Sequence, residues 1–306
     1  MTNELTRALR AVLRPPDWPA GIAREPVRRN VGLDYDGAWS RRPAANALRR
    51  GLFDVVGAPL TRLVASPTVY GREHLDPLEG PVIFVSNHAS HLDTAVVLSS
   101  LPERFRKRTV VAAAVDYFFD RRWKAALSSM MLGAIPVERA RVNRKSADIA
   151  AALLEDGWNL VIFPEGGRSP DGWGQEFRGG AAYLAKRCGV PVVPMHLRGV
   201  RPIIPKGSVR VRPGSVEVRI GDALRPLPRG ESRREEDARH FALRIETAVS
   251  MLGDEAETDW WTARRRAALG TTPEFRGPDI STWRRAWSLP ASARDNERPR
   301  GNRRPW

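Results

Sequence analysis

The chain has 306 residues, of which 42% are hydrophobic, so it is long enough to bury a sizeable core in one large domain. Its 50 Lys and Arg outnumber its 35 Asp and Glu, and the net charge of +15 indicates an anionic partner, such as a phosphorylated substrate or an acidic lipid surface. The single cysteine excludes an internal disulfide and a CxxC centre, and the lack of an 18-residue apolar run or an apolar leader predicts neither a membrane span nor a secretion signal.

The basic excess is spread along the chain rather than gathered in one recognition helix. Residues 1–66 and residues 257–306 each carry 11 Arg against 6 acidic residues, and no nucleic-acid-binding motif accompanies them. We therefore expect no nucleic-acid partner and interpret the charge as attraction to anionic lipid headgroups.

The N-terminal part of the chain divides into two segments. Residues 1–43 are rich in Arg and Pro, which predicts an irregular arm. Residues 44–65 have a helical pattern of apolar positions that is interrupted near Pro59 and flanked by arginines. Such an amphipathic pair of short helices can lie in a bilayer interface or pack on the sheet of its own domain.

Apolar strand-like runs and helical patterns then alternate along the chain. We expect strands at about 82–86, 109–115, 134–138, 160–163 and 192–198. We expect helices at about 92–101, 119–132, 144–156 and 180–187. This alternation predicts an α/β fold with a mainly parallel or mixed central sheet covered by helices.

A hairpin and a closing helix are expected after the sheet. Residues 209–212 and 215–220 alternate about Pro213 and Gly214, which is typical of a hairpin, and residues 231–252 have a helical pattern. The Trp/Arg-rich residues 257–306 form either a lipid-docking segment or a loosely packed extension. The predicted organisation is thus an arm at 1–43, one domain at 44–256 and an extension at 257–306.

A histidine and an aspartate follow the first expected strand. In VSNHASHLD, His88 and Asp93 are five positions apart, directly after the apolar run 81–85. Open α/β sheets bind ligands at the carboxyl ends of their strands. If Asp93 bonds one imidazole nitrogen, the other nitrogen of His88 is free to take a proton from a hydroxyl group, so His88 is a candidate general base. A hydrogen-bonded loop without catalytic function is the alternative.

Three further blocks accompany SNHASHLD: GAIPVER at 133–139, FPEGGRS at 163–169 and VPVVPM at 190–195. In this order and spacing, the four blocks resemble the 1-acyl-glycerol-3-phosphate acyltransferase family of glycerolipid acyltransferases over about residues 69–222. The resemblance implies a base at His88, its orienting partner at Asp93, and an arginine for the acceptor phosphate at Arg139. The residues of the third block that it assigns to acceptor binding are Glu165, Gly166, Arg168 and Ser169. In the fourth block, it assigns Pro191 and Pro194 either to acyl-chain binding or to shaping the site.

Two departures from the family pattern bear on the choice of acceptor. Gly167 stands where the family commonly has Thr, which removes a hydroxyl group and adds backbone freedom. The second block has Pro136 and Glu138 where the pattern often has aromatic and aliphatic residues. We expect these changes to affect the identity of the acceptor rather than the reaction.

The arginines of these blocks suit a phosphate on chemical grounds as well. A guanidinium group pairs two donors with phosphate oxygens, so Arg139 and Arg168 at separate strand ends could hold one phosphate from two sides. Arg178 lies in the same glycine-rich stretch as Arg168, ahead of a helix whose start adds a favourable dipole. The alternative is a surface loop with solvated arginines. For Glu165 we favour a structural role in shaping the loop over acid chemistry.

The resemblance implies an O-acyltransferase acting on a phosphorylated glycerolipid such as 1-acyl-glycerol-3-phosphate. Its acyl donor would be a thioester on coenzyme A or acyl carrier protein, with no further cofactor and no metal. The charge and the lack of a span predict a cytoplasmic protein, peripheral on the inner face of the membrane. Cys188 is expected to be a small hydrophobe, because a thioester nucleophile needs an activating neighbour.

Two other functions remain open from the sequence. One is a metal-dependent hydrolase that uses His88, His91 and Asp93, with His196 as a further ligand, since these residue types bind catalytic metals. The other is a non-catalytic peripheral lipid-binding protein.

Overall fold

A computed structural model describes residues 35–119, 121–138, 144–169, 173–204, 211–227 and 236–276. These residues form a seven-stranded sheet in the order β1-β7-β6-β2-β5-β3-β4. The strands are β1 (Pro67–Tyr70), β2 (Ile83–Ser86), β3 (Thr109–Ala114), β4 (Ala134–Val137), β5 (Asn159–Ile162), β6 (Val192–Arg198) and β7 (Val216–Ile220). Each neighbouring pair is parallel except β6 and β7, which are antiparallel. The predicted mixed sheet is confirmed.

Strand β2 is the centre of the fold. All of its residues are buried, and Phe84 pairs with Val161 of β5 on one side and with Val193 of β6 on the other. A strand buried on both faces needs a continuous apolar run, which is the pattern of residues 82–85. Because β2 lies between two parallel partners, the loop that follows it emerges beside the carboxyl ends of β5 and β6.

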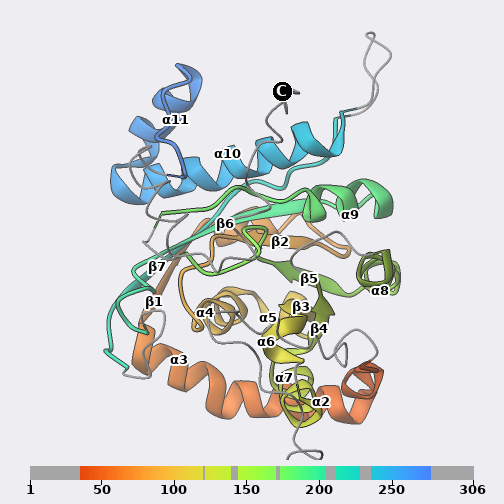
Figure 1. Cartoon of the computed structure of the whole chain (residues 1–306). Coiled ribbons are helices and arrows are strands. Elements are labelled where there is room, and N and C mark those ends of the chain that lie inside the picture. The colour runs from red at the N-terminus through yellow and green to blue at the C-terminus, as the bar shows by residue number, and fades with distance from the viewer. Residues whose placement is uncertain are drawn as a thin grey trace, which may run out of the picture. The chain divides into compact units, whose positions relative to one another are not determined.

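Helices cover both faces of the sheet (Figure 1). On one face lie α8 (Arg144–Glu155), α9 (Gly180–Cys188) and α10 (Ala238–Glu257), whose buried residues share a core with β2 and β5. The other face is covered by α3 (Ala58–Ala65), α4 (Asp93–Ser100) and α5 (Glu103–Arg106), which pack on a second core around Phe84. The remaining helical elements are η1 (Ala38–Arg41), α2 (Pro43–Leu52), η2 (Phe53–Gly57), η3 (Arg72–Leu75), α6 (Val115–Phe118), α7 (Arg122–Leu132) and α11 (Trp260–Ala268). None of the helices in the described part of the chain is long and apolar enough to cross a membrane.

The segment expected as an amphipathic helix pair is helical from Pro43 to Ala65. The π-helical turn η2 joins helices α2 and α3 without a gap. The interruption expected near Pro59 is therefore absent. Pro59 occupies the first turn of α3, where a missing N–H group is tolerated. Many apolar side chains of this segment are exposed, including Val55 and Leu63.

The predicted hairpin is wrong. Val211 and Arg212 are not in a strand, and the backbone N–H of Arg212 donates to the carbonyl of Ile203, while residues 209 and 210 lie outside the described part. The second arm is β7, which pairs with β6 on one side and with β1 on the other. Strand β1 was not expected, because four residues beginning with Pro67 give too short a pattern. With β1 present, β7 is satisfied on both edges without a hairpin partner.

The closing helix is present as α10, shifted toward the C-terminus relative to residues 231–252. Its N-cap is Asp237, whose side chain accepts from the backbone N–H of His240. Of the extension expected at 257–306, residues up to 276 are described, and α11 packs on α10 with Ala263 fully buried. Of the arm expected at 1–43, residues 1–34 lie outside the described part, and Ala38–Arg41 form a 3-10 helix. The domain boundaries themselves stay a prediction.

Candidate active site

The residues of the first sequence block form the loop between β2 and α4. Asn87 fixes the start of this loop to β6, because its side-chain amide donates to the carbonyl of Leu197 (2.9 Å) and its oxygen accepts from the N–H of the same residue (2.8 Å). Further along, the Ser90 hydroxyl donates to the carbonyl of Ile204 (3.0 Å). These contacts join residues more than 100 positions apart and hold the loop at the carboxyl end of the central strand.

His88 and Asp93 form the predicted pair within this loop. His88 Nδ1 lies 2.8 Å from Asp93 Oδ2, and the aspartate is completely buried. The same oxygen accepts from the backbone N–H groups of Ala89 (2.6 Å) and Ser90 (2.8 Å). Because backbone N–H groups can only donate, Asp93 Oδ2 acts as an acceptor, and the imidazole supplies its hydrogen at Nδ1. In a neutral ring, Nε2 of His88 then carries the lone pair of a base.

Three further contacts fix the position of His88. Its ring stacks on Phe163, with centroids 4.4 Å apart and an interplanar angle of 22°. Its backbone N–H donates to Glu165 Oε1 (2.7 Å), and its carbonyl accepts from the N–H of Ser169 (2.8 Å). The side chain of His88 keeps 17% of its surface exposed, so the ring is held firmly and still reaches the outside.

Glu165 has the contacts of a shaping residue. It is buried, and its two oxygens accept from different backbone segments, Oε1 from His88 and Oε2 from the N–H of Gln175 (3.0 Å). The side chain of Gln175 in turn donates to the carbonyl of Gly167 (3.1 Å). Glu165 therefore links the histidine loop to residues 173–178, which agrees with the structural role favoured from the sequence.

Gly166 and Arg178 lie against each other. Gly166 has a φ of +70°, and a Cβ at this position would be 2.8 Å from Nε of Arg178. The guanidinium group of Arg178 thus packs against the backbone of Gly166, in space that the Cβ of any other residue would occupy. The backbone N–H of Arg178 donates to the carbonyl of Pro164 (3.0 Å), which returns the chain to the end of β5.

The other predicted acceptor residues are placed less completely. Ser169 is buried beside His88, and its N–H makes the contact given above. Arg168 lies close enough to His91 for its charge to lower the pKa of that histidine, after the larger effect of burial. Arg139 lies outside the described residues. The structure therefore brings His88, Asp93, Glu165, Gly166, Ser169 and Arg178 together, and the role of each in binding stays a prediction.

The carbonyl groups of both prolines in the fourth block accept hydrogen bonds at the central sheet. That of Pro191 accepts from the N–H of Ile83 (3.0 Å), and that of Pro194 accepts from the N–H of Gly221 (2.9 Å). Pro194 is paired with Val85 in the register of β2 and β6. These contacts align the strands that carry the histidine loop.

The residues of the metal-site alternative lie within the described part of the chain. Among the described residues, no three His, Cys, Asp or Glu side chains are grouped so that they could hold a metal ion. His196 packs against α10, where a Cβ on Gly253 would lie 3.0 Å from its Nε2, and burial lowers its pKa to about 4, with smaller effects from Arg198 and Arg219. Cys188 ends α9, and burial, followed by the charge of Glu155, raises the pKa of its thiol, which makes it a poor nucleophile.

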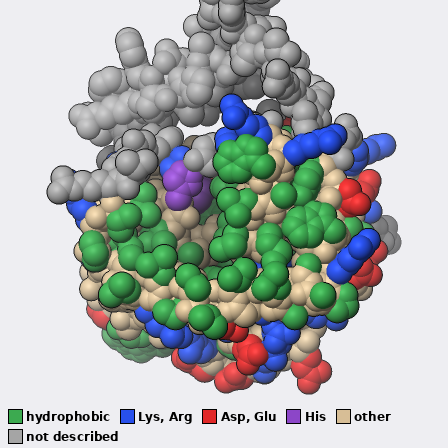
Figure 2. Space-filling model, turned by 90° about the horizontal axis from the view of Figure 1, so that it is seen from below, with side chains coloured by type: hydrophobic (Ala, Val, Ile, Leu, Met, Phe, Trp, Pro, Cys, Tyr) green, Lys and Arg blue, Asp and Glu red, His purple; other side chains and the backbone are tan. Residues whose placement is uncertain are grey.

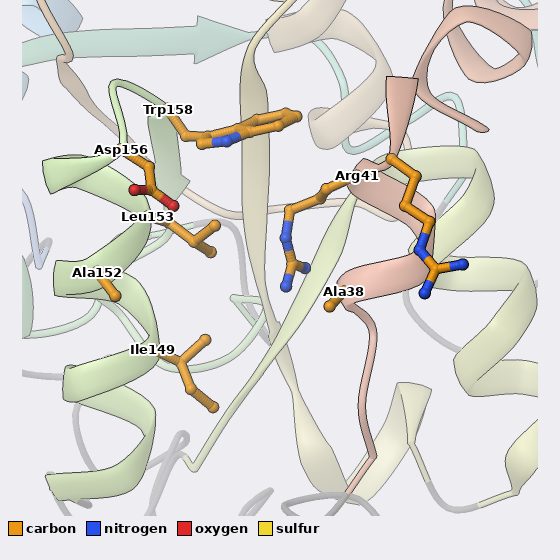
Figure 3. A pocket seen from close by; sticks show the side chains of 8 residues that line it. Ala38, Arg41, Ile149, Ala152, Leu153, Asp156 and Trp158 are labelled. Carbon is orange, nitrogen blue, oxygen red and sulfur yellow. The ribbon is translucent and has the colours of Figure 1, made fainter. Parts of the chain in front are cut away.

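A cavity of about 490 Å³ lies elsewhere (Figure 3). Trp158, Asp156, Leu153 and Ile149 point into it from α8 and the turn after it, and Ala38 and Arg41 lie opposite (Figure 3). Trp158 precedes the first residue of β5, whereas Phe163 and His88 lie beyond its last residue. The cavity is thus at the amino end of this strand, away from the candidate site.

Some residues of the site were not singled out from the sequence. Asn87, Phe163 and Gln175 all contact the histidine loop or its support, and the first two lie inside blocks whose neighbours were chosen. The signal for Asn87 and Phe163 was position, because each directly follows the last residue of a strand. Gln175 had no such signal, because its partner Glu165 lies 10 positions away in an irregular segment.

In sequence and fold, the chain is similar to known acyltransferases. Residues 66–198 match the family model described as Acyltransferase. A 1-acyl-sn-glycerol-3-phosphate acyltransferase of Chlamydomonas reinhardtii is 32% identical over 162 residues, which are 52% of this chain and 47% of that protein. The alpha form of 1-acyl-sn-glycerol-3-phosphate acyltransferase from Homo sapiens is 29% identical over 197 residues, or 62% of this chain and 65% of that protein. The chain thus spans about half to two thirds of the length of these curated relatives.

A solved structure shares the fold. The crystal structure of the 1-acyl-sn-glycerophosphate (LPA) acyltransferase PlsC from Thermotoga maritima superposes with a TM-score of 0.57 at 24% identity. The match covers 72% of this chain and 84% of that one.

Proposed function

We propose that the protein transfers a fatty acyl group from a thioester to the free hydroxyl of a phosphorylated glycerolipid such as 1-acyl-glycerol-3-phosphate. The match of residues 66–198 to the family model described as Acyltransferase supports this proposal, as does the resemblance of the four sequence blocks. The observation that carries the proposal is the orientation of His88, with Nδ1 held by a buried aspartate and the ring stacked on Phe163. The curated relatives are named for this reaction, which supports the same class of acceptor.

The proposed reaction uses His88 as a general base. Nε2 of His88 takes the proton of the acceptor hydroxyl, and the oxygen attacks the thioester carbonyl carbon. Backbone N–H groups at nearby turns stabilise the oxyanion that forms. The carbon–sulfur bond then breaks, the thiolate leaves, and the proton on His88 neutralises the leaving group. Asp93 stabilises the imidazolium through its contact with Nδ1. The step needs no covalent enzyme intermediate and no metal.

The acceptor phosphate would be held by arginines at the strand ends. Arg178 lies across Gly166, and Arg168 lies near His91 in the same turn region. Both guanidinium groups suit phosphate oxygens, and Arg139 is the third arginine that the family pattern assigns to this role. The donor would be acyl-coenzyme A or an acyl carrier protein thioester, each being a co-substrate rather than a bound cofactor.

A panel of acceptors tests the proposed activity. Purified protein is incubated with a labelled acyl thioester and with lysophosphatidate, a lysolipid with a larger phosphorylated headgroup, or monoacylglycerol. We expect label in the product of lysophosphatidate and little or none in that of monoacylglycerol, because the second lacks the phosphate. His240→Ala is a control variant. This histidine is exposed on α10, so its substitution should leave the amount of product unchanged. Labelling of none of the acceptors would refute the proposed function.

We further propose a peripheral location at the membrane. Exposed apolar side chains gather on helices that adjoin each other, and Figure 2, seen from the side of α2 and α3, shows them around a hollow with a histidine at its edge. They are Leu48, Leu52, Val55, Val56, Leu60 and Leu63 of α2, η2 and α3, and Trp123, Leu127 and Met131 of α7. A patch of this kind is unusual on a protein surface exposed only to water, and it suits an interfacial site for a lipid substrate.

Vesicle binding tests this location. We expect the double variant Val55→Asp/Leu63→Asp to lose most of its sedimentation with vesicles of phosphatidylglycerol, because 75% of Val55 and 74% of Leu63 are exposed on the proposed contact face. Leu243→Asp is the control, as this exposed leucine lies on α10 across the sheet. Equal binding by both variants would remove this face from the proposal. A sodium chloride series then measures the electrostatic part of binding by the basic residues.

A further inference from the structure

The loop at residues 173–178 lies between two sets of partners. None of its residues is in a helix or a strand, so its backbone N–H groups need partners outside regular secondary structure. On its inner side, the N–H of Gln175 donates to Glu165, and that of Arg178 donates to Pro164. These contacts join the loop to the candidate active site.

The outer side of the same loop contacts a part of the chain that lies beyond the matched domain. The N–H of Gly174 donates to the carbonyl of Phe275 (3.0 Å), and the N–H of Phe177 donates to Glu246 Oε2 (2.9 Å). The rings of Phe177 and Phe275 meet edge to face with centroids 5.2 Å apart. The matched family region ends at residue 198, so this support is supplied by residues that follow it.

An ion pair closes the outer set of contacts. Arg276 Nε lies 3.1 Å from Glu246 Oε1, and Arg276 also lies 3.8 Å from Glu176 of the loop. Glu246 is mostly buried, with 13% of its side chain exposed, so its pairing with Arg276 and with the N–H of Phe177 avoids an uncompensated charge. One glutamate of α10 thereby holds both the loop and the segment at 273–276.

The sequence is adapted to this contact at Gly174. A Cβ on Gly174 would lie 1.9 Å from the ring of Phe275, so the aromatic ring rests directly on the backbone of the loop. Any larger side chain would push the ring away and break the hydrogen bond to the carbonyl of Phe275. The glycine and the phenylalanine, about 100 positions apart, therefore form one packing unit.

We propose that residues 273–276 and Glu246 form a C-terminal strap that positions the loop 173–178 for acceptor binding. The contacts run without a break from Arg276 to Glu246, then to Phe177 and Gln175 of the loop, and then through Glu165 to the backbone N–H of His88. Arg178, at the end of the loop, lies over Gly166 in the candidate acceptor site. The strap residues touch no reacting group and act as positioning residues. This inference rests on the proposed function for the role of Arg178.

The strap predicts a specific change in kinetics. In Glu246→Ala and Phe275→Ala, loss of a loop contact should raise the KM for lysophosphatidate by about fivefold or more, the effect of about one hydrogen bond, with less change in the KM for the acyl thioester. Glu246→Gln keeps an oxygen for the N–H of Phe177 but loses the charge that pairs with Arg276, so its KM should lie between those of the wild type and Glu246→Ala.

The matched control is Arg266→Ala. Arg266 pairs with Asp254 at 2.5 Å and ties α11 to α10, but it makes no contact with the loop in the described structure. This variant should lower the melting temperature without raising the acceptor KM. If the acceptor KM of Glu246→Ala and Phe275→Ala equals that of the wild type, or rises equally in Arg266→Ala, the strap is refuted.

Hydrogen exchange gives a second measurement that needs no activity. Amide exchange of residues 173–178 should be faster in Glu246→Ala and Phe275→Ala than in the wild type, and unchanged in Arg266→Ala. If the wild type transfers no acyl group to any acceptor, the proposed function fails while exchange still decides whether the strap orders the loop. Unchanged exchange in both strap variants would overturn the inference whatever the activity.

Discussion

The histidine loop and the second loop, whose described residues are 165–169 and 173–178, are neighbours that are built in different ways. Asp93 meets its donors three, four and five positions away, so the pair with His88 forms within one short turn. The second loop depends on distant partners: Glu165 meets His88 across 77 positions, and Phe177 meets Glu246 across 69. Local contacts form the His88–Asp93 pair itself, while Asn87 and Ser90 anchor its loop to residues more than 100 positions away. The second loop is ordered by the rest of the fold, and we expect substitutions there to alter acceptor binding more than the chemical step.

The largest effect should follow from removing the charge of Asp93. Asp93→Asn keeps one oxygen that can accept at the position of Oδ2, but it loses the negative charge that stabilises the imidazolium, and an amide in the other orientation would place an NH2 group against three donors. We expect kcat to fall about 10²- to 10⁴-fold with little change in the acceptor KM. Steady-state kinetics with both substrates measure this. A large rise in the acceptor KM with a normal kcat would contradict the assignment of the chemical step to the histidine loop and of acceptor binding to the second loop.

A smaller effect should come from the second loop at Gly166. Gly166→Ala places a Cβ at a φ of +70° and 2.8 Å from Nε of Arg178, so the arginine must move. We expect the acceptor KM to rise about tenfold, the effect of a weakened charged contact, and the free energy of unfolding to fall by about 1–2 kcal/mol. Thermal or urea unfolding measures the second quantity.

Gly189→Ala is the matched control for this substitution. Gly189 has a φ of +66° at the end of α9, and among the described residues no atom beyond its immediate chain neighbours lies within 4 Å of the point where a Cβ would stand. The substitution therefore introduces the same backbone strain without displacing an arginine. It should lose similar stability and keep the acceptor KM. An equal KM in the two variants would mean that Arg178 does not bind the acceptor.

The last effect, on stability rather than on kinetics, concerns the scaffold that both loops share. Burial lowers the pKa of His196 to about 4, so the folded protein keeps this histidine neutral while the unfolded chain binds a proton below about pH 6.5. The protonation of this histidine does not affect stability above pH 6.5, and the free energy of unfolding decreases by about 3 kcal/mol as the pH falls to 4. Unfolding titrations of the wild type and His196→Gln should diverge over this range. A parallel pH dependence would contradict the assignment.

Much of the fold could be predicted from the sequence, because its strands are buried on both faces and its helices are periodic. Strands β2 to β6 and helices α4, α7, α8 and α9 agree with the expected ranges within a few residues. The prediction of a hairpin was wrong because alternation of apolar and polar residues indicates an extended strand but does not identify the strand with which it pairs. The partner of β7 was β1, a strand of four residues that periodicity cannot detect.

The candidate site divides along the same line. The pairing of His88 with Asp93 could be predicted, since a spacing of five between a strand end and a helix start brings the two side chains together. The contacts of the strap residues Glu246 and Phe275 with the loop at 173–178 could not be predicted, because nothing in a single sequence links α10 to a glycine-rich loop before the fold is known. The structural role of Glu165 was expected from its chemistry, but its bond to the backbone of His88 was not.

The most direct test of the account is the turnover of His88→Ala against that of His91→Ala. Both are histidines of the same loop, and the proposed base is His88, whose Nδ1 is held by Asp93 and whose ring stacks on Phe163. With a labelled acyl thioester and lysophosphatidate, we predict that kcat falls about 10²- to 10⁴-fold in His88→Ala and stays within a few-fold of the wild type in His91→Ala. Near-normal turnover in His88→Ala, or an equal loss in both variants, would contradict a base held by a buried aspartate.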